Sequence, residues 1–448
     1  SCMTIALRQR PLARVVAGIV SANDGALFDP SDLSTLYQDA AGTTPVTAVE
    51  QPVGKILDKS GNGNHATQSV TASRPVLSAR YNLLTSSDDA SSLAWGKDLG
   101  SVVNISASNP LNLPLVSKFI PNATAGIHRV AQEWNPIPGA KYTQKVLLKS
   151  AGVRFVYINI YANAGAKLCV DLQTGQYVAS GLTPEGASVV GLGDGWYLCS
   201  ISGTGTSQTG NKTWFQANGF FSAADDYTFT GSGSNGFLIA AADLRIGTTA
   251  GPYQRVNTAT DYDTDERYFK KYLRFDGVDD YLNLPYMGLY AGGAASIVCA
   301  SDAVSQTTDT YIISERSTTD ADPKYFPSRQ LANAGNMDTF ITNDAGAVVL
   351  DTVGSPFSGV ANAVIRSIVD SGNNLKLFKN GVLAANDNYA RSGALTLNTT
   401  TIGASVSTTT SNYASMKLYG LIVTKSALTD AQRVACERYL GRKSGVPL

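Results

Sequence analysis

The stretch RFVYINIYA (154–162) decides the fold class, because its side chains alternate in character along the chain. Successive side chains of a β-strand point to opposite faces of the sheet, so this period of two predicts a half-buried strand. Val156, Ile158 and Ile160 form its apolar face. The other face carries aromatic and amide groups, Phe155, Tyr157, Asn159 and Tyr161.

Two further segments extend the pattern. KTWFQANGFF (212–221) alternates in the same way and predicts a second strand. NLKLFKNGVLAA (374–385) predicts a hairpin, because Asn380-Gly381 stands between two apolar-rich runs. Many short strands joined by glycine- and asparagine-rich turns are typical of β-sandwiches. We therefore predict a mainly β fold built from antiparallel sandwiches.

One segment carries the signals of a helix, SALTDAQRVACERYLGRK (426–443). Thr429 and Gln432 have the spacing of a capping box, in which side chains satisfy the first backbone N–H groups. Arg442 and Lys443 fall in the last turn, where the helix dipole favours cations. The sequence thus predicts a short C-terminal helix.

Composition excludes several partners. The 448 residues are more than one average domain needs, so we expect two or more cores. The 35 basic and 35 acidic residues balance, so the overall field gives no reason to expect nucleic acid or a membrane surface. No apolar run is long enough for a transmembrane helix.

The cysteines are widely spaced, so we expect reduced, buried thiols and leave a Cys169–Cys199 bridge open.

A shift in composition marks a domain boundary. All four tryptophans lie between residues 80 and 262, and the polar, acidic run NTATDYDTDERYFKK (257–271) follows. We therefore predict a separate sandwich at 81–262 with its own core.

Residues 1–27 contain three arginines before a short apolar run, which is too short for a typical signal peptide. We interpret 1–27 as a basic, partly extended arm.

Four stretches resemble the laminin-G-like, concanavalin-type jelly rolls of bacteriophage structural proteins. They include the loop SGNGNHAT (60–67), the loop FDGVDDYL (275–282), the hairpin 375–385 and the ending 416–446. In such domains the two loops usually lie close in sequence, whereas roughly two hundred residues separate them here. This spacing indicates a jelly roll of 28–80 and 263–448 that is interrupted by an insert, as surface loops allow.

The insert has a resemblance of its own. YNLLTSSDDASSLAWGK (81–97), DGWYLCSISGT (194–204) and LRIGTTAGPYQRVN (244–257) resemble a phage head-spike or tail-fibre sandwich related to carbohydrate-binding modules. Together the resemblances imply a non-enzymatic virion adhesin: a tail fibre, tail tip or head spike, assembled in the bacterial host cytoplasm. They imply a homotrimer that binds host-surface polysaccharide and contacts other virion proteins through the arm 1–27. A polysaccharide depolymerase and a purely architectural virion protein are the alternatives.

Catalytic motifs are missing from the sequence. His65 and His128 are the only histidines, and neither belongs to a metal-binding helix motif. No G-x-S-x-G elbow and no strand of alternating acids occurs. GSGSNG (231–236) and GNGNHA (61–66) match glycine fingerprints, but no βαβ unit surrounds them. We therefore expect loops there, no nucleotide and no enzyme.

A glycan site is predicted from the alternating strands. Sugars present apolar C–H faces and hydroxyl rims, so a binding face needs exposed aromatic rings beside amide groups. If the two strands share a sheet, they build one aromatic–amide face, which we list as Tyr157, Asn159, Tyr161, Trp214, Gln216 and Asn218. The alternative is that these residues line the core. Trp134, beside two prolines, is predicted at the rim.

One acidic run leaves room for calcium. DYDTDE (261–266) places Asp261, Asp263 and Asp265 at alternate positions, and oxygen-rich loops suit this ion. The run lacks the glycine and glutamate of an EF-hand. The alternative interpretation is a solvated linker, and no other cofactor is expected.

Overall fold

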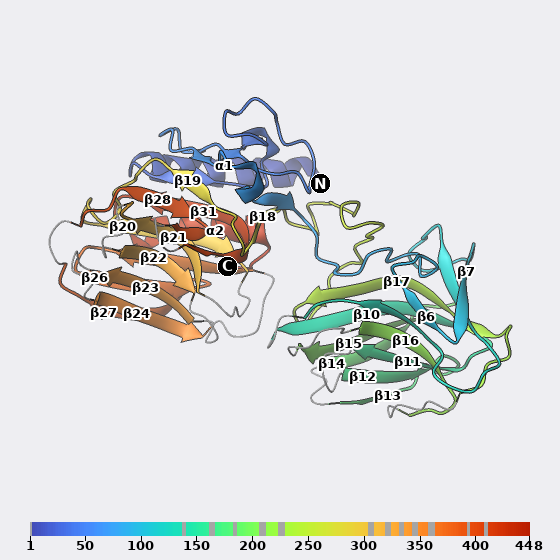
Figure 1. Cartoon of the computed structure of the whole chain (residues 1–448). Helices are drawn as coiled ribbons and strands as arrows, with labels where there is room; N and C mark the ends of the chain where they lie inside the picture. The colour runs from blue at the N-terminus through green and yellow to red at the C-terminus, as the bar shows by residue number, and fades with distance from the viewer. Residues whose placement is uncertain are drawn as a thin grey trace. The chain divides into compact units, whose positions relative to one another are not determined.

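The computed structural model shows two compact units, Ser1–Ala79 with Lys270–Leu448 (unit 1) and Arg80–Phe269 (unit 2) (Figure 1). Strands account for 47% of the chain and helices for 8%, so the fold is mainly β, with one antiparallel sandwich inserted in another. The described residues are 2–136, 140–160, 166–181, 186–205, 212–222, 229–302, 309–318, 324–330, 336–342, 348–356, 363–391, 395–406 and 411–448.

Unit 1 is a sandwich of two antiparallel sheets within the described residues. The first runs in the order β27 (Val382–Asn388), β26 (Asn374–Lys379), β25 (Val364–Asp370), β20 (Ala295–Ser301), β31 (Ser415–Thr424), β18 (Tyr272–Asp276) and β5 (Val76–Ser78), with β1 (Ala26–Phe28) also on β31. The second runs β2 (Leu36–Tyr37), β3 (Lys55–Ile56), β4 (Ala66–Thr67), β19 (Leu282–Leu284), β28 (Thr399–Ile402), β21 (Thr310–Arg316), β22 (Lys324–Gln330), β23 (Asn336–Thr342) and β24 (Val348–Pro356). A ribbon joins β29 (Ala404–Val406) to β30 (Ser411–Tyr413). Side chains of both sheets, such as Ile297 and Ile313, share one buried core.

Unit 2 is a sandwich of two six-stranded antiparallel sheets, counted over the described part of the chain. One sheet runs β14 (Gly186–Gly191), β15 (Trp196–Thr204), β10 (Lys141–Ala151), β17 (Gly236–Ile246), β8 (Val116–Pro121) and β7 (Gly100–Ile105). The other runs β13 (Tyr177–Ser180), β12 (Ala166–Asp171), β11 (Phe155–Ile160), β16 (Lys212–Asn218), β9 (Arg129–Glu133) and β6 (Gly96–Asp98). The apolar faces of β10, β11 and β16 meet in a core of their own. Cys169 and Cys199, on different sheets, are free and buried, so no bridge joins them.

The predicted helix and hairpin are confirmed. The helix is α2 (Asp430–Ser444), and Thr429 and Gln432 form the capping box at its start. The hairpin joins β26 to β27, and its turn residues Asn380 and Gly381 have φ of 47° and 80°. Only a residue that tolerates positive φ at both positions permits this tight turn. None of the described helices is long and apolar enough to span a membrane.

The N-terminal segment differs from the predicted extended arm. Residues Cys2–Ser21 form a helix, α1, which packs against α2 and β31 in unit 1. Val16 and Val20 are fully buried on it. Helix formation here depends on this packing, because a marginal helix gains most of its stability from a buried apolar face.

A buried carboxylate joins the two ends of unit 1. Asp29 is fully buried and accepts a hydrogen bond from the Tyr439 hydroxyl of α2 at 2.7 Å. The ammonium groups of Lys59 and Lys443 lie 3.1 and 2.9 Å from the same carboxylate. Nearby, the SGNGN loop holds Gly25 through amide hydrogen bonds, so this loop is structural.

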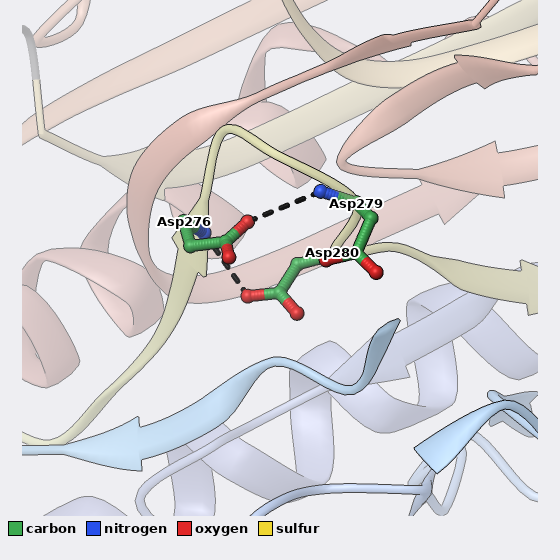
Figure 2. Close-up of side chains that lie close together, drawn as sticks. All are labelled: Asp276, Asp279 and Asp280. Carbon is green, nitrogen blue, oxygen red and sulfur yellow. Dashed lines mark hydrogen bonds between the residues drawn. The ribbon is translucent and has the colours of Figure 1, made fainter. Parts of the chain in front are cut away.

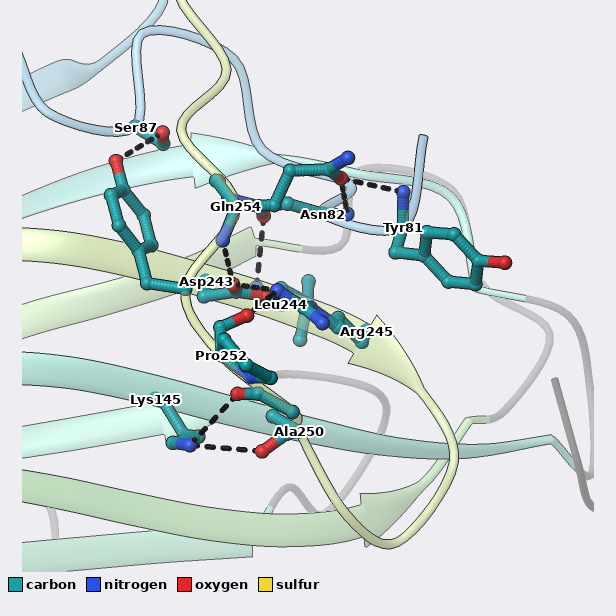
Figure 3. A network of polar contacts seen from close by, with 12 residues as sticks. Tyr81, Asn82, Ser87, Lys145, Asp243, Leu244, Arg245, Ala250, Pro252 and Gln254 are labelled. Atoms are coloured by element: carbon teal, nitrogen blue, oxygen red, sulfur yellow. Dashed lines mark hydrogen bonds and ion pairs between the residues drawn. The ribbon is translucent and has the colours of Figure 1, made fainter. Parts of the chain in front are cut away.

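A second buried network closes unit 2 (Figure 3). Arg245 donates two hydrogen bonds to the Asp243 carboxylate, at 2.7 and 2.6 Å, and both side chains are buried. The backbone N–H of Gln254 donates to Asp243 at 3.1 Å. The Gln254 side-chain oxygen accepts from the backbone N–H groups of Tyr81 and Asn82, at 2.7 and 3.0 Å. The first and last segments of the insert are therefore joined on β17.

We predict that Asp243→Asn destabilises unit 2 by about 3–5 kcal/mol, because it leaves the Arg245 charge buried without its partner. Urea unfolding followed by tryptophan fluorescence measures this, since all four tryptophans lie in unit 2. The control is Arg267→Ala, which removes a pair whose arginine side chain is 77% exposed. It should cost less than about 1 kcal/mol. Equal effects of the two changes would contradict the role of the network.

Candidate functional site

The predicted aromatic–amide face is assembled on one sheet of unit 2. Strands β11 and β16 are neighbours, with Tyr157 opposite Gln216 and Asn159 opposite Trp214. Tyr157, Trp214 and Cys169 form a small cluster on the face away from the main core. Tyr161 lies outside the described residues. The sequence thus identified which side chains share a face.

These side chains are buried, however. Exposure is 0% for Tyr157, 1% for Asn159 and 8% for Trp214. The Asn159 side-chain oxygen has no hydrogen-bond partner, although its amide nitrogen donates to the Tyr157 hydroxyl at 3.5 Å. In this structure the face is therefore not the open platform that the alternation predicted. The period of a strand shows which residues share a face, but not what covers that face.

Trp134 is a core residue and not the predicted rim aromatic. It is 6% exposed and belongs to the main core of unit 2. Its ring meets that of Tyr142 edge-on at 4.7 Å between centroids. The neighbouring prolines suggested a loop, but the residue follows β9 directly and continues its inward-facing side.

An open pocket of about 310 Å³ lies elsewhere in unit 2. Its lining comes from three segments, 152–155, 218–219 and 229–232, together with Asn235. We call it the end pocket, because these segments lie at the start of β11, the end of β16 and the approach to β17. Its volume is at the lower end of the range for small-ligand sites, roughly 300–1,000 Å³.

Local backbone geometry shapes this pocket. Gly152 has φ of 107°, and a Cβ atom there would lie 2.5 Å from the Asn235 side chain. Glycine therefore permits both the turn between β10 and β11 and the close approach of Asn235. The Asn218 amide nitrogen donates to the Ser222 carbonyl at 3.4 Å, and its oxygen accepts from Gln216 at 3.1 Å.

Arg154 is the charged residue of the end pocket. Its Nε and Nη2 donate to the Asp171 carboxylate at 3.0 and 2.7 Å. These hydrogen bonds hold the pKa of Asp171 at about 2, below its ordinary 3.8. The guanidinium carbon also lies 4.9 Å from the ring centroid of Phe155, and the Phe155 and Phe221 rings are 5.7 Å apart. The lining of the pocket therefore combines an oriented cation, the aromatic rings of Phe155 and Phe229, and the amide groups of Asn218 and Asn235.

Among the residues that line this pocket, only Asn218 was a predicted site residue, although the alternation also placed Phe155 on the aromatic–amide face. Arg154 is the first residue of the predicted strand 154–162, but its partner Asp171 lies on the neighbouring strand β12. Turn residues such as Gly152 are recognisable in the sequence, but the three segments that line the pocket are brought together only by the pairing of their strands. No pattern in the sequence indicates that contact.

The three predicted calcium ligands do not come together. Asp261 accepts from the Asn257 side chain, Asp263 faces Arg255, and Asp265 pairs with Arg267. Among the described residues, the carboxylates that do gather are Asp276, Asp279 and Asp280, within 4.8 Å of one another (Figure 2). The structure thus does not gather the three carboxylates of the linker into one set of ligands, and their separate partners agree with the alternative of a solvated linker.

The gathered carboxylates stabilise a loop in unit 1. Asp276 accepts from the backbone N–H groups of Val278 and Asp279, at 2.7 and 3.3 Å. Asp280 accepts from the backbone N–H of Asp276 at 3.0 Å, and Asp279 accepts from the Ser73 hydroxyl. Burial and then the charge of Asp276 raise the pKa of Asp280 to about 7. The folded loop is therefore more stable with Asp280 protonated than with Asp280 ionised.

We predict that Asp280→Asn stabilises unit 1 at pH 8 and has little effect near pH 4. The folded pKa of Asp280, about 7, lies above its ordinary value of 3.8, so the stability that it contributes is lost as pH rises from about 4 to about 7 and stays lost above that. Asparagine keeps the acceptor without the charge. Calorimetry at both pH values measures the change, roughly 2–4 °C in Tm for each kcal/mol. A calcium-dependent rise in Tm that Asp280→Asn abolishes would instead identify a cation site.

Comparisons with known proteins found partial likenesses to solved structures. No family model and no curated protein matches the chain. Among solved structures, a Ruminococcus gnavus IT-sialidase CBM40 is 17% identical, with TM-score 0.31 over 37% of this chain and 95% of its own. The botulinum neurotoxin serotype D binding domain is 10% identical, with TM-score 0.30 over 43% and 48%. Domain 4 of AbnA, a Geobacillus stearothermophilus arabinanase, is 15% identical, with TM-score 0.28 over 37% and 76%. Such low scores carry no argument about function.

Proposed function

We propose that unit 2 is a carbohydrate-binding sandwich that holds a sugar in the end pocket. The observation that carries this proposal is the lining itself, in which Phe155, Arg154 and Asn235 converge on one open cavity. An aromatic ring can stack on the apolar face of a sugar, while guanidinium and amide groups bond its hydroxyls. The described residues that line the pocket include no carboxylate, which favours binding without turnover.

The wider role that we propose is that of a non-enzymatic bacteriophage adhesin. It rests on the resemblance of the loops 60–67 and 275–282, and of the insert, to phage virion proteins. On this proposal the chain is a tail-fibre, tail-tip or head-spike protein, located in the virion. It binds host-surface polysaccharide as a homotrimer, which would raise avidity for weak sugar contacts. The N-terminal segment 1–27 would contact other virion proteins.

We predict that Arg154→Ala and Asn235→Ala each weaken glycan binding by the purified chain. Hydrogen bonds from a charged donor are stronger than neutral ones, so Arg154→Ala should cost roughly tenfold in affinity. Asn235 is an exposed residue, so its substitution should weaken binding without unfolding unit 2. A glycan array followed by calorimetric titration measures both, and Arg267→Ala is the control, expected to bind normally.

Two further results would change the proposal. Arg129→Ala removes a guanidinium that lies 4.8 Å over the Trp214 ring, on the aromatic–amide face. Loss of binding in this variant, with Arg154→Ala unaffected, would move the site to that face. New reducing ends after incubation with polysaccharide would indicate a depolymerase. An array without any signal would refute carbohydrate binding and favour an architectural role.

A further inference from the structure

The Arg154 guanidinium is oriented before any ligand binds. The buried Asp171 carboxylate accepts hydrogen bonds from the Nε–H of Arg154 and from one N–H of its Nη2. The carboxylate is itself fixed by the backbone N–H of Gln173 at 2.9 Å and the Thr174 hydroxyl at 3.0 Å. The arginine side chain remains 47% exposed. One N–H of Nη1 and the second N–H of Nη2 therefore form a free edge with two parallel donors, to which none of the described residues is hydrogen-bonded.

The charge of this pair cancels. With the pKa of Asp171 held at about 2, both partners are ionised at every ordinary pH. Arg154 is the sole charged residue among the described residues that line the end pocket. An incoming anion would therefore face a guanidinium whose positive charge is already shared with a carboxylate.

The geometry of the free edge suits two adjacent oxygen atoms. Two vicinal hydroxyls of a sugar or one carboxylate could each accept from the two N–H donors. The carboxylate would place a second negative charge across the same guanidinium from Asp171, and like charges at this separation repel. A diol bears no charge and meets no such repulsion. Phe155, beside the guanidinium, offers an apolar surface to the sugar ring.

We infer that the end pocket selects neutral sugars with a vicinal diol over acidic sugars, with Arg154 bonding the diol and Asp171 setting the selectivity. This inference rests on the proposed carbohydrate-binding function and names its ligand class. Asp171 is a positioning residue, because it acts through Arg154 and does not line the pocket.

The test uses matched pairs of methyl glycosides with the full chain. Glucoside and glucuronide, galactoside and galacturonide, and mannoside and mannuronide differ only in whether C6 is a hydroxymethyl group or a carboxylate. A titration monitored by NMR gives the dissociation constant of each glycoside. We expect the neutral member to bind roughly tenfold more tightly in at least one pair. That affinity should change little between low and high salt, because no net charge is neutralised. Tighter binding of the uronides, lost in Arg154→Ala, would overturn this inference and leave carbohydrate binding intact.

Asp171→Asn gives the sharper result. It leaves the pocket with one net positive charge, so the preference should shift toward the uronide by tenfold or more and become sensitive to salt. The control is Asp98→Asn, which alters another arginine pair of unit 2 and should leave the preference unchanged. Tryptophan fluorescence shows that each variant is folded. An unchanged preference in folded Asp171→Asn would overturn the inference, and binding of neither sugar class by the wild type would overturn it together with the proposed function.

Discussion

The buried ion pair between Asp243 and Arg245 is the interaction on which the insert depends (Figure 3). Asn82 donates from its amide to the carbonyls of Ala242 and Gln254, so segments 172 residues apart meet on one strand. A buried charge is tolerated only where its partners are complete. Here Gln254 and Pro252 of the last segment bond Asp243 and Arg245, and the Gln254 side chain in turn binds the first segment at Asn82. Closure of the domain and burial of the pair are therefore one event.

The same strand connects this closure to the candidate site. Asp243 and Arg245 stand near the end of β17, whereas Asn235 comes directly before its first residue, Gly236. A strand rises about 3.3 Å per residue, so the two regions are roughly 25–30 Å apart. One end of β17 is held by ionic and amide contacts, and the other presents the pocket. A rigid element of this kind can position binding groups more accurately than a free loop.

The sequence predicted those features of the fold that depend on neighbouring residues. The capping box at Thr429 and the turn at Asn380-Gly381 are local, and both are confirmed. The helix α1 was missed, because it packs against α2 and β31, which lie some four hundred residues away in the sequence, and this packing buries its valines. The end pocket was missed for the same reason, since Arg154 meets Asp171 through strand pairing.

The sequence by itself determined that this chain builds β-strands, which side chains share each strand face, and where a capped helix closes the chain. Those properties follow from a period of two and from hydrogen bonds between near neighbours. Only the tertiary structure decided that the face of Tyr157 and Asn159 is buried, and that Arg154 stands at an open pocket. Burial and charge pairing depend on segments far apart in the chain, and alternation along one strand carries no information about them.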